Sequence, residues 1–149
     1  MSIKRDALYS SATDEWETPQ DLFDELDEVF HFTLDACATA ENAKCERYYT
    51  REQDGLQQPW TGNVWCNPPY GKDLPRWLEK ATREIRENAD VIVMLIHART
   101  DTRWFHEYVY RRPGVTTHFI RGRLKFGGAP YNAPFPSMIA VFRRPMLWE

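Results

Sequence analysis

The hydrophobic pattern along the chain predicts an α/β domain, because strand-like apolar runs alternate with segments whose apolar residues have helical spacing. Residues 91–96 form a continuous apolar run, which is typical of a strand covered on both faces of a parallel sheet. Shorter β-branched or aromatic runs predict five further strands, at residues 32–38, 46–50, 63–66, 116–120 and 137–143. Apolar residues spaced three or four apart predict helices over residues 19–30 and 73–88, and a third helix from Thr100 or Asp101. This order predicts a mostly parallel sheet with helices packed on it and an antiparallel hairpin at one edge.

Local signals mark where the predicted helices begin. Thr18 is a favourable N-cap, and Pro19 suits the first helical position because a missing N–H does no harm there. At the start of the second helix, Asp73 and Pro75 give similar signals. Glu79 and Arg83 have the spacing of an ion pair on the outer face of this helix.

The stretch Asn67-Pro68-Pro69-Tyr70 stands out because it follows the predicted strand 63–66 directly. Proline cannot continue a central strand, so the chain must leave the sheet there in a stiff turn. Such a turn fixes the direction of the Asn67 side chain and of the neighbouring carbonyls. An amide oxygen and a carbonyl can together accept both hydrogens of a flat –NH2 group, and the Tyr70 ring can stack on the base that carries it. The alternative is a Pro-Pro turn with a structural tyrosine.

Several other polar residues also fall at predicted strand ends, where open α/β sheets bind ligands. The strand 32–38 ends in the acidic residue Asp35 and the small residues Ala36, Cys37 and Ala38, although the usual glycines of such a turn are absent. Asp54 lies 19 residues further on and could hold a ribose, or it could simply form an Asp-Gly turn. His97 ends the strand 91–96.

The distribution of charge is more informative than the net charge of −3. Residues 1–60 contain 14 acidic and five basic residues, whereas residues 97–149 contain nine basic and three acidic ones. A domain with one basic side can still attract DNA. We expect Arg99, Arg103, Arg123 and Lys125 to contact DNA, because they lie in segments that leave strand ends. We expect Arg111, Arg112, Arg143 and Arg144 to be solvated surface residues.

Composition narrows the remaining possibilities. The 149 residues suit a single domain, 42% of them are hydrophobic, and no apolar run is long enough for a membrane span. Residues 1–13 lack the apolar core of a signal peptide and are expected to be flexible. Three cysteines without paired spacing argue against a zinc site or disulfides and favour a reduced, cytoplasmic protein without a metal.

Taken in order, these motifs resemble the phage-type (Dam-like) DNA N6-adenine methyltransferases. The resemblance extends from about Glu15 to Phe142 and rests on six segments, residues 16–19, 34–38, 54–56, 65–70, 99–105 and 122–126. It implies a Rossmann-like methyltransferase fold, a mostly parallel sheet with an antiparallel edge hairpin, that is smaller than usual and lacks a separate target-recognition domain. It also implies that the protein uses S-adenosylmethionine (SAM) as its cofactor. Position 67 is Asn, where the better-known Dam enzymes have Asp.

The resemblance also implies a catalytic or cofactor-binding role for individual residues. The adenine leaves the duplex, Tyr70 stacks on it, and Asn67 with a carbonyl at Pro68 accepts from its amine while the methyl group is transferred directly. The catalytic segment is then Asn67, Pro68, Pro69 and Tyr70. The residues implied for SAM binding are Trp16, Thr18, Pro19, Asp35, Ala36, Cys37 and Asp54.

Alternatives with the same motif remain open at this point. The acceptor could be cytosine N4, an RNA adenine or a protein glutamine, or the protein could bind SAM and DNA without catalysis. Only short loops are available to read base edges, so we expect loose sequence specificity. A monomer or a homodimer in the cytoplasm of a bacterial host, encoded by a phage or prophage, fits the resemblance.

Overall fold

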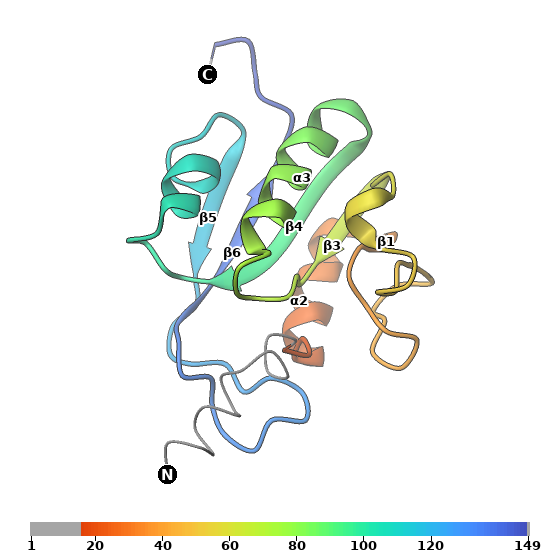
Figure 1. Cartoon of the computed structure of the whole chain (residues 1–149), viewed down its shortest axis with the longest axis vertical. Helices are drawn as coiled ribbons and strands as arrows, with labels where there is room; N and C mark the ends of the chain where they lie inside the picture. The colour runs from red at the N-terminus through yellow and green to blue at the C-terminus, as the bar shows by residue number, and fades with distance from the viewer. Residues whose placement is uncertain (1–15, 149) are drawn as a thin grey trace.

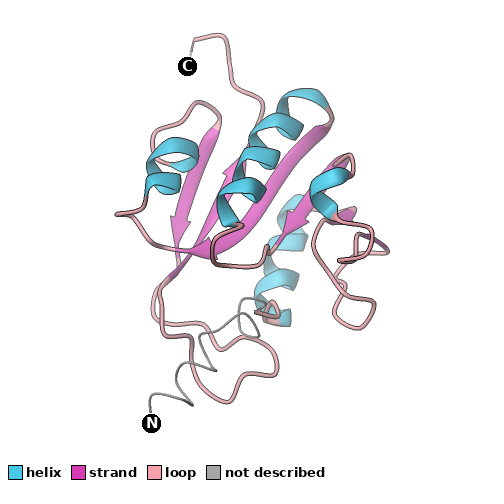
Figure 2. Ribbon diagram, in the orientation of Figure 1, coloured by secondary structure: helices cyan, strands magenta, loops and turns pink. Residues whose placement is uncertain are grey.

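The computed structural model describes residues 16–148, which form one sheet with helices on both faces (Figures 1 and 2). Its elements in chain order are the helix α2 (Gln20–Phe30), the strands β1 (Leu34–Asp35) and β2 (Arg47–Tyr48), the 3₁₀ turn η2 (Gly55–Gln57), the strand β3 (Gly62–Cys66), the helix α3 (Leu74–Glu87), the strand β4 (Ala89–His97), the π-helical turn η3 (Phe105–Val109), and the strands β5 (Val115–Phe119) and β6 (Ser137–Phe142).

The six strands have the order β2-β1-β3-β4-β6-β5. The strands β2, β1, β3 and β4 are parallel, whereas β6 is antiparallel to both β4 and β5. The predicted mostly parallel sheet with an antiparallel hairpin at one edge is therefore confirmed. The chain moves from β1 outward to β2 and then back past β1 to β3, so the direction of winding reverses at β1. Ligands of open α/β sheets bind at such a reversal, beyond the carboxyl ends of the strands.

Alternate residues of β4 explain why its sequence is apolar throughout. Ile92, Met94 and Ile96 are buried in the cluster under α3, whereas Val93 and Leu95 are buried in the cluster under α2. Figure 1 shows α3 in front of the sheet and α2 behind it. Both faces of the central strand are thus covered, as the pattern predicts for a parallel sheet.

Local predictions were less accurate at the ends of elements. Pro19, and not Thr18, is the N-cap of α2, and no side chain in the described part of the chain caps that helix. The Thr18 hydroxyl instead accepts a hydrogen bond from a distant side chain, described below. The third helix is reduced to the short η3. The Phe105 backbone N–H at its start donates to the hydroxyl of Thr102, and not to Thr100 or Asp101. The strands predicted at 32–38 and 46–50 have only two residues each.

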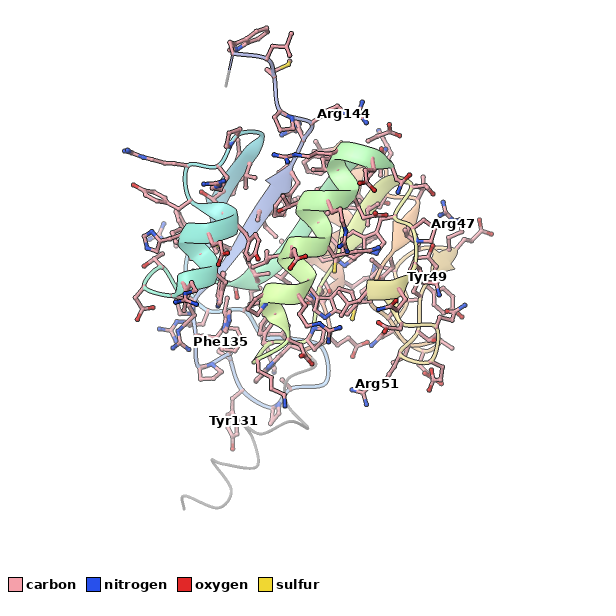
Figure 3. The ribbon with its side chains drawn as sticks, turned by 45° about the horizontal axis from the view of Figure 1, so that its top comes forward. Arg47, Tyr49, Arg51, Tyr131, Phe135 and Arg144 are labelled. Carbon is pink, nitrogen blue, oxygen red and sulfur yellow. The ribbon has the colours of Figure 1, made fainter. Side chains whose placement is uncertain are left out.

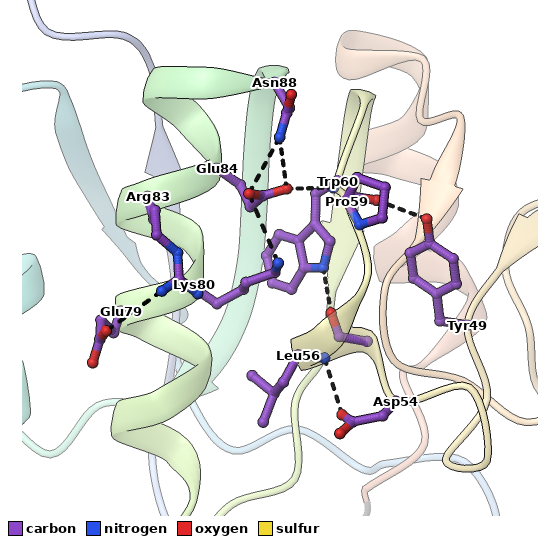
Figure 4. Close-up of polar contacts among 11 residues, drawn as sticks. Tyr49, Asp54, Leu56, Pro59, Trp60, Glu79, Lys80, Arg83, Glu84 and Asn88 are labelled. Atoms are coloured by element: carbon purple, nitrogen blue, oxygen red, sulfur yellow. Dashed lines mark hydrogen bonds and ion pairs between the residues drawn. The ribbon is translucent and has the colours of Figure 1, made fainter.

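A buried polar network fixes the loop before β3 against α3 (Figure 4). The Glu84 carboxylate accepts a hydrogen bond of 2.6 Å from the Trp60 backbone N–H and lies 3.7 Å from the Lys80 ammonium. The Trp60 indole in turn donates to the Gly55 carbonyl and stacks near the Trp77 ring. The predicted Glu79–Arg83 pair is present on the outer face of the same helix. This network holds η2, and with it Asp54, in a fixed place.

None of the helices between residues 16 and 148 has the length and the apolar character that crossing a membrane requires. Residues 1–13, expected to be flexible, lie outside the described part of the chain.

Candidate functional site

The carboxyl ends of the parallel strands bring most of the predicted site residues to one edge of the sheet. β1 pairs with β3 so that Asp35 is opposite Trp65, two residues before Asn67. The Ala36 backbone N–H continues this pairing by donating to the Trp65 carbonyl. β4 pairs with β3 on the other side and ends at His97. Asp35, Asn67 and His97 therefore end three neighbouring strands, as the sequence predicts.

Asn67 is held by its amide nitrogen. Its Nδ2 donates to the Trp16 backbone carbonyl and to Thr18 Oγ1, the latter at 3.0 Å. Its Oδ1 is buried and has no hydrogen-bond partner among residues 16–148. An unpaired acceptor is costly in a protein interior, so such an atom at the mouth of a strand indicates a place for an outside donor.

Tyr70 lies inside a group of aromatic rings. Its side chain is 5% exposed, and its hydroxyl donates to the Leu95 carbonyl at 3.2 Å. The His97 ring stacks on it at 4.8 Å between centroids and itself stacks on Trp104 at 5.4 Å. The Phe135 ring meets Tyr70 edge-on at 5.4 Å. Burial lowers the pKa of His97 to about 4, so this ring is neutral at physiological pH.

Pro68 and Pro69, between Asn67 and Tyr70, form the turn that the sequence predicts. β3 ends at Cys66, just before Asn67, and no residue from 67 to 70 is in a strand. Pro68 is buried and Pro69 is half-buried, so this turn is part of the packed structure.

Asp35 is buried at the end of β1. Its carboxylate accepts hydrogen bonds from the backbone N–H groups of Cys37, at 3.3 Å, and Lys44, at 3.0 Å. Burial raises its pKa from the ordinary 3.8 to about 6, although both N–H groups act in the opposite direction. The side chain thus organises the loop that follows β1, and it also places an acid in a poorly solvated position where a cation would be stabilised.

Asp54 lies near the same end of β1, because the next residue, Gly55, packs against Ala36. A Cβ added to Gly55 would lie 2.2 Å from the Ala36 carbonyl, so only glycine permits this contact. Asp54 itself has a φ of 57°, and its carboxylate accepts from the Leu56 N–H at 3.1 Å. The predicted Asp-Gly turn is therefore present, and it packs directly against Ala36.

The basic residues separate into two groups by position. Arg99, Arg103, Arg123 and Lys125 are all exposed, and they follow the carboxyl ends of β4 and β5, at the edge where Asn67 lies. Arg111 and Arg112 precede β5, and Arg143 and Arg144 follow β6, which places them at the opposite edge. In Figure 3 Arg144 lies far from Phe135 and Tyr131, which belong to the long loop below the carboxyl edge.

An open hollow of about 520 Å³ beside β2 is lined by Leu34, Gln53 and residues 46–50, none of which is a predicted site residue. Within residues 16–148 no group of three His, Cys, Asp or Glu side chains could hold a metal ion. None of the three cysteines forms a disulfide.

Sequence reasoning missed several residues that contact either Tyr70 or His97. They are the rings of Trp104, Phe126 and Phe135 and the hydroxyl of Ser137, the second buried side-chain atom without a partner in residues 16–148. Their common signal was weak: aromatic and small polar residues in loops that lead away from or back to strand ends. The pairing of His97 with Ser137 in the sheet and the hydrogen bond from Gly127 to Glu17 bring these loops together.

The fold and the site together define a Rossmann-like α/β domain. A buried acid and an amide oxygen without a partner among residues 16–148 lie at the carboxyl ends of its adjacent strands. The sequence model of the DNA N-6-adenine-methyltransferase (Dam) family matches residues 6–145. The chain therefore belongs to this family, which confirms the resemblance seen in the sequence.

Individual relatives agree with the family. The chain is 37% identical over 97 residues to the DNA N-6-adenine-methyltransferase of Escherichia phage T1, a match that covers 63% of this chain and 40% of the phage protein. It is 37% identical over 65 residues to YfdM, an inferred methyltransferase of Escherichia coli (strain K12), covering 38% of this chain and 71% of YfdM. The match thus spans less than half the length of the phage enzyme.

A solved structure of an inferred RNA methyltransferase from Pyrococcus horikoshii is also similar. It aligns with a TM-score of 0.44 at 18% identity, over 68% of this chain and 52% of the other.

Proposed function

We propose that this protein transfers a methyl group from SAM to the exocyclic N6 of adenine in DNA. The observation that carries the proposal is the orientation of Asn67, whose amide nitrogen is held by two acceptors while its Oδ1 is buried and unpaired among the described residues. The family membership and the phage relative support the choice of adenine in DNA.

In this proposal the acceptor amine is held by atoms of the Asn67–Tyr70 turn. Asn67 Oδ1 and a carbonyl at Pro68 accept from the two N–H bonds of the amine, which takes its lone pair out of conjugation with the ring and directs it at the methyl group. When bound, SAM supplies an electrophilic methyl group, which leaves as its carbon–sulfur bond breaks and the sulfonium becomes a neutral thioether. The amine nitrogen would form the new bond to that methyl carbon as the carbon–sulfur bond breaks, and it would then lose one proton to solvent water. The chain acts by positioning and by placing charge, without a side-chain nucleophile.

The residues proposed for SAM lie around the reversal of winding at β1. Asp35 stabilises a cation there, Ala36 and Cys37 provide a small-residue loop, and Asp54 approaches from η2. The chemistry of this set fits the cofactor, since SAM carries an ammonium and a sulfonium and the buried carboxyl of Asp35 has the opposite charge when ionised. Trp16 and Pro19 border the same edge from the segment before α2.

The base reaches Tyr70 by displacing a neighbouring ring. Tyr70 is covered in this structure, and the rings of His97 and Phe135 beside it are partly exposed. Stacking on Tyr70 returns about 1–3 kcal/mol, which offsets much of the cost of unstacking the adenine. Arg99, Arg103, Arg123 and Lys125 hold the DNA backbone beside the site. Because they contact phosphates, they give little sequence specificity.

A transfer assay with tritiated SAM tests the proposal, with double-stranded DNA, RNA and a protein extract as parallel acceptors. We expect label in DNA and none above background in RNA or protein. Label that is confined to RNA or to protein would reject DNA as the substrate. SAM binding without transfer to any acceptor would favour a non-catalytic binding protein.

A further inference from the structure

Trp16 and Thr18, which the sequence suggests for cofactor binding, both accept hydrogen bonds from the side chain of Asn67. The Trp16 carbonyl and Thr18 Oγ1 are both acceptors for Asn67 Nδ2, across gaps of 51 and 49 residues in sequence. Thr18 is 5% exposed, so its hydroxyl has little access to water. We refer to these two acceptors as the amide clamp.

The amide clamp decides which end of the Asn67 side chain faces outward. A backbone carbonyl can only accept, so the –NH2 end of the amide must face Trp16 and the oxygen must point away from it. Reversing the amide would bring two acceptors together and leave the nitrogen without a partner. The clamp therefore fixes Oδ1 in the orientation in which it has no partner among residues 16–148.

The clamp is itself anchored on both sides. The Glu17 carbonyl accepts from the Gly127 N–H at 2.9 Å, which ties the segment to the long loop before β6. The Trp16 ring packs against Phe126 and Phe135 at 5.3 and 5.4 Å between centroids. Beyond the clamp the chain enters α2 immediately. An acceptor held by a helix and by a second loop is suited to precise positioning.

We propose that Trp16, through its carbonyl, and Thr18, through its hydroxyl, are positioning residues that make the site depend on an amide at position 67. The inference rests on the proposed function, because it assigns the rate of methyl transfer to the orientation of Asn67. Thr18 then sets the rate of transfer and not the affinity for SAM.

A carboxylate at position 67 provides the sharpest contrast. In Asn67→Asp the ionised carboxylate places an acceptor against the Trp16 carbonyl, where neither atom can donate. When that carboxyl is protonated, its O–H can donate to the Trp16 carbonyl and leave the other oxygen facing outward, as in the wild type. The activity of Asn67→Asp should therefore rise as the pH falls, relative to the wild type measured at the same pH.

The experiment measures initial rates of methyl transfer to DNA at saturating SAM for the wild type and four variants, together with SAM affinity by calorimetry. At pH 8 we expect Asn67→Asp to be slower by roughly 5- to 100-fold. That deficit shrinks towards pH 6. Thr18→Val should lose roughly two- to tenfold in kcat with an unchanged Kd for SAM, while Thr18→Ser retains the wild-type rate. Thr82→Val removes a hydroxyl that donates to the Leu78 carbonyl within α3, and it serves as the control with wild-type kcat.

Several outcomes would overturn the inference. One is an Asn67→Asp rate equal to the wild type at pH 8, and another is a deficit that does not change with pH. A Thr18→Val variant that raises the Kd for SAM at unchanged kcat would make Thr18 a cofactor contact instead.

An NMR measurement tests the clamp independently of activity. The side-chain –NH2 protons of Asn67 should exchange slowly with water in the wild type and faster in Thr18→Val. Rapid exchange in the wild type would refute the clamp. If the wild type does not methylate DNA, the proposed function fails, and the exchange data still decide whether the clamp exists.

Discussion

Asp35 provides a prediction whose size follows from its surroundings. Burial raises its pKa by about two units, and each unit corresponds to 1.36 kcal/mol, so ionising Asp35 in the folded protein costs about 3 kcal/mol. Because the folded pKa is the higher one, this contribution to stability is fully present below pH 4 and is lost as the pH rises through 6. Asp35→Asn carries no charge at any pH and should lack this dependence.

Urea denaturation of both proteins at pH 4 and pH 7.5 measures the effect. The free energy of unfolding of Asp35→Asn should rise by about 3 kcal/mol relative to the wild type between these two values. In Asp35→Asn the hydrogen bonds from Cys37 and Lys44 do not change with pH, and their effect on ionised Asp35 is already contained in its pKa. A difference that does not change with pH would mean that Asp35 is solvated in the folded protein.

The same titration should appear in cofactor binding if Asp35 faces a cation of SAM. The Kd of the wild type for SAM should be roughly tenfold weaker at pH 5 than at pH 7, because about nine-tenths of Asp35 is then protonated. Asp35→Asn should bind weakly at both values. A wild-type affinity that stays constant over this range would place the cation elsewhere.

Three further predictions concern other parts of the molecule. Tyr70→Phe should retain most of the methyl transfer and lose about 1 kcal/mol of stability, because its hydroxyl donates to a buried carbonyl, whereas Tyr70→Ala should lose transfer in the same rate assay. Lys125→Ala should weaken DNA binding to all sequences and reduce the slope of log affinity against log salt by about one, while Arg144→Ala at the opposite edge leaves the slope unchanged. Equal slopes for these two variants would refute the division of the basic residues. Glu84→Ala should lower the free energy of unfolding by about 3–5 kcal/mol, because Lys80 would be left buried without its partner. A loss below 1 kcal/mol in urea denaturation would show that this network is solvated.

Much of the architecture could be predicted from local sequence. The run from Val91 to Ile96 specifies a strand buried on both faces, because every residue of it is apolar. The turn at Pro68 and Pro69 specifies where β3 stops. The position of β6 between β4 and β5 was not predicted, because a run of apolar residues does not specify which strand it will pair with.

The site could be predicted in part for the same reason. The placement of Asp35 and Asn67 at one edge of the sheet was predicted, because both follow strands that pair in parallel. Thr18 was assigned to a helix cap, since its local sequence suits one, and a tertiary hydrogen bond from Asn67 overrode that preference. The stacking of Tyr70 on His97 depends on side-chain positions that no local pattern encodes.

The most direct test of the proposed activity is to identify the methylated nucleoside. Plasmid DNA from a strain without adenine methylation is incubated with SAM and either the wild type or Asn67→Ala, digested to nucleosides and analysed by mass spectrometry. We predict N6-methyldeoxyadenosine from the wild type and none from Asn67→Ala, even though calorimetry shows that the variant still binds SAM. N4-methyldeoxycytidine as the product, or equal amounts of methyladenine from both proteins, would contradict the assignment of Asn67 as the acceptor of the adenine amine.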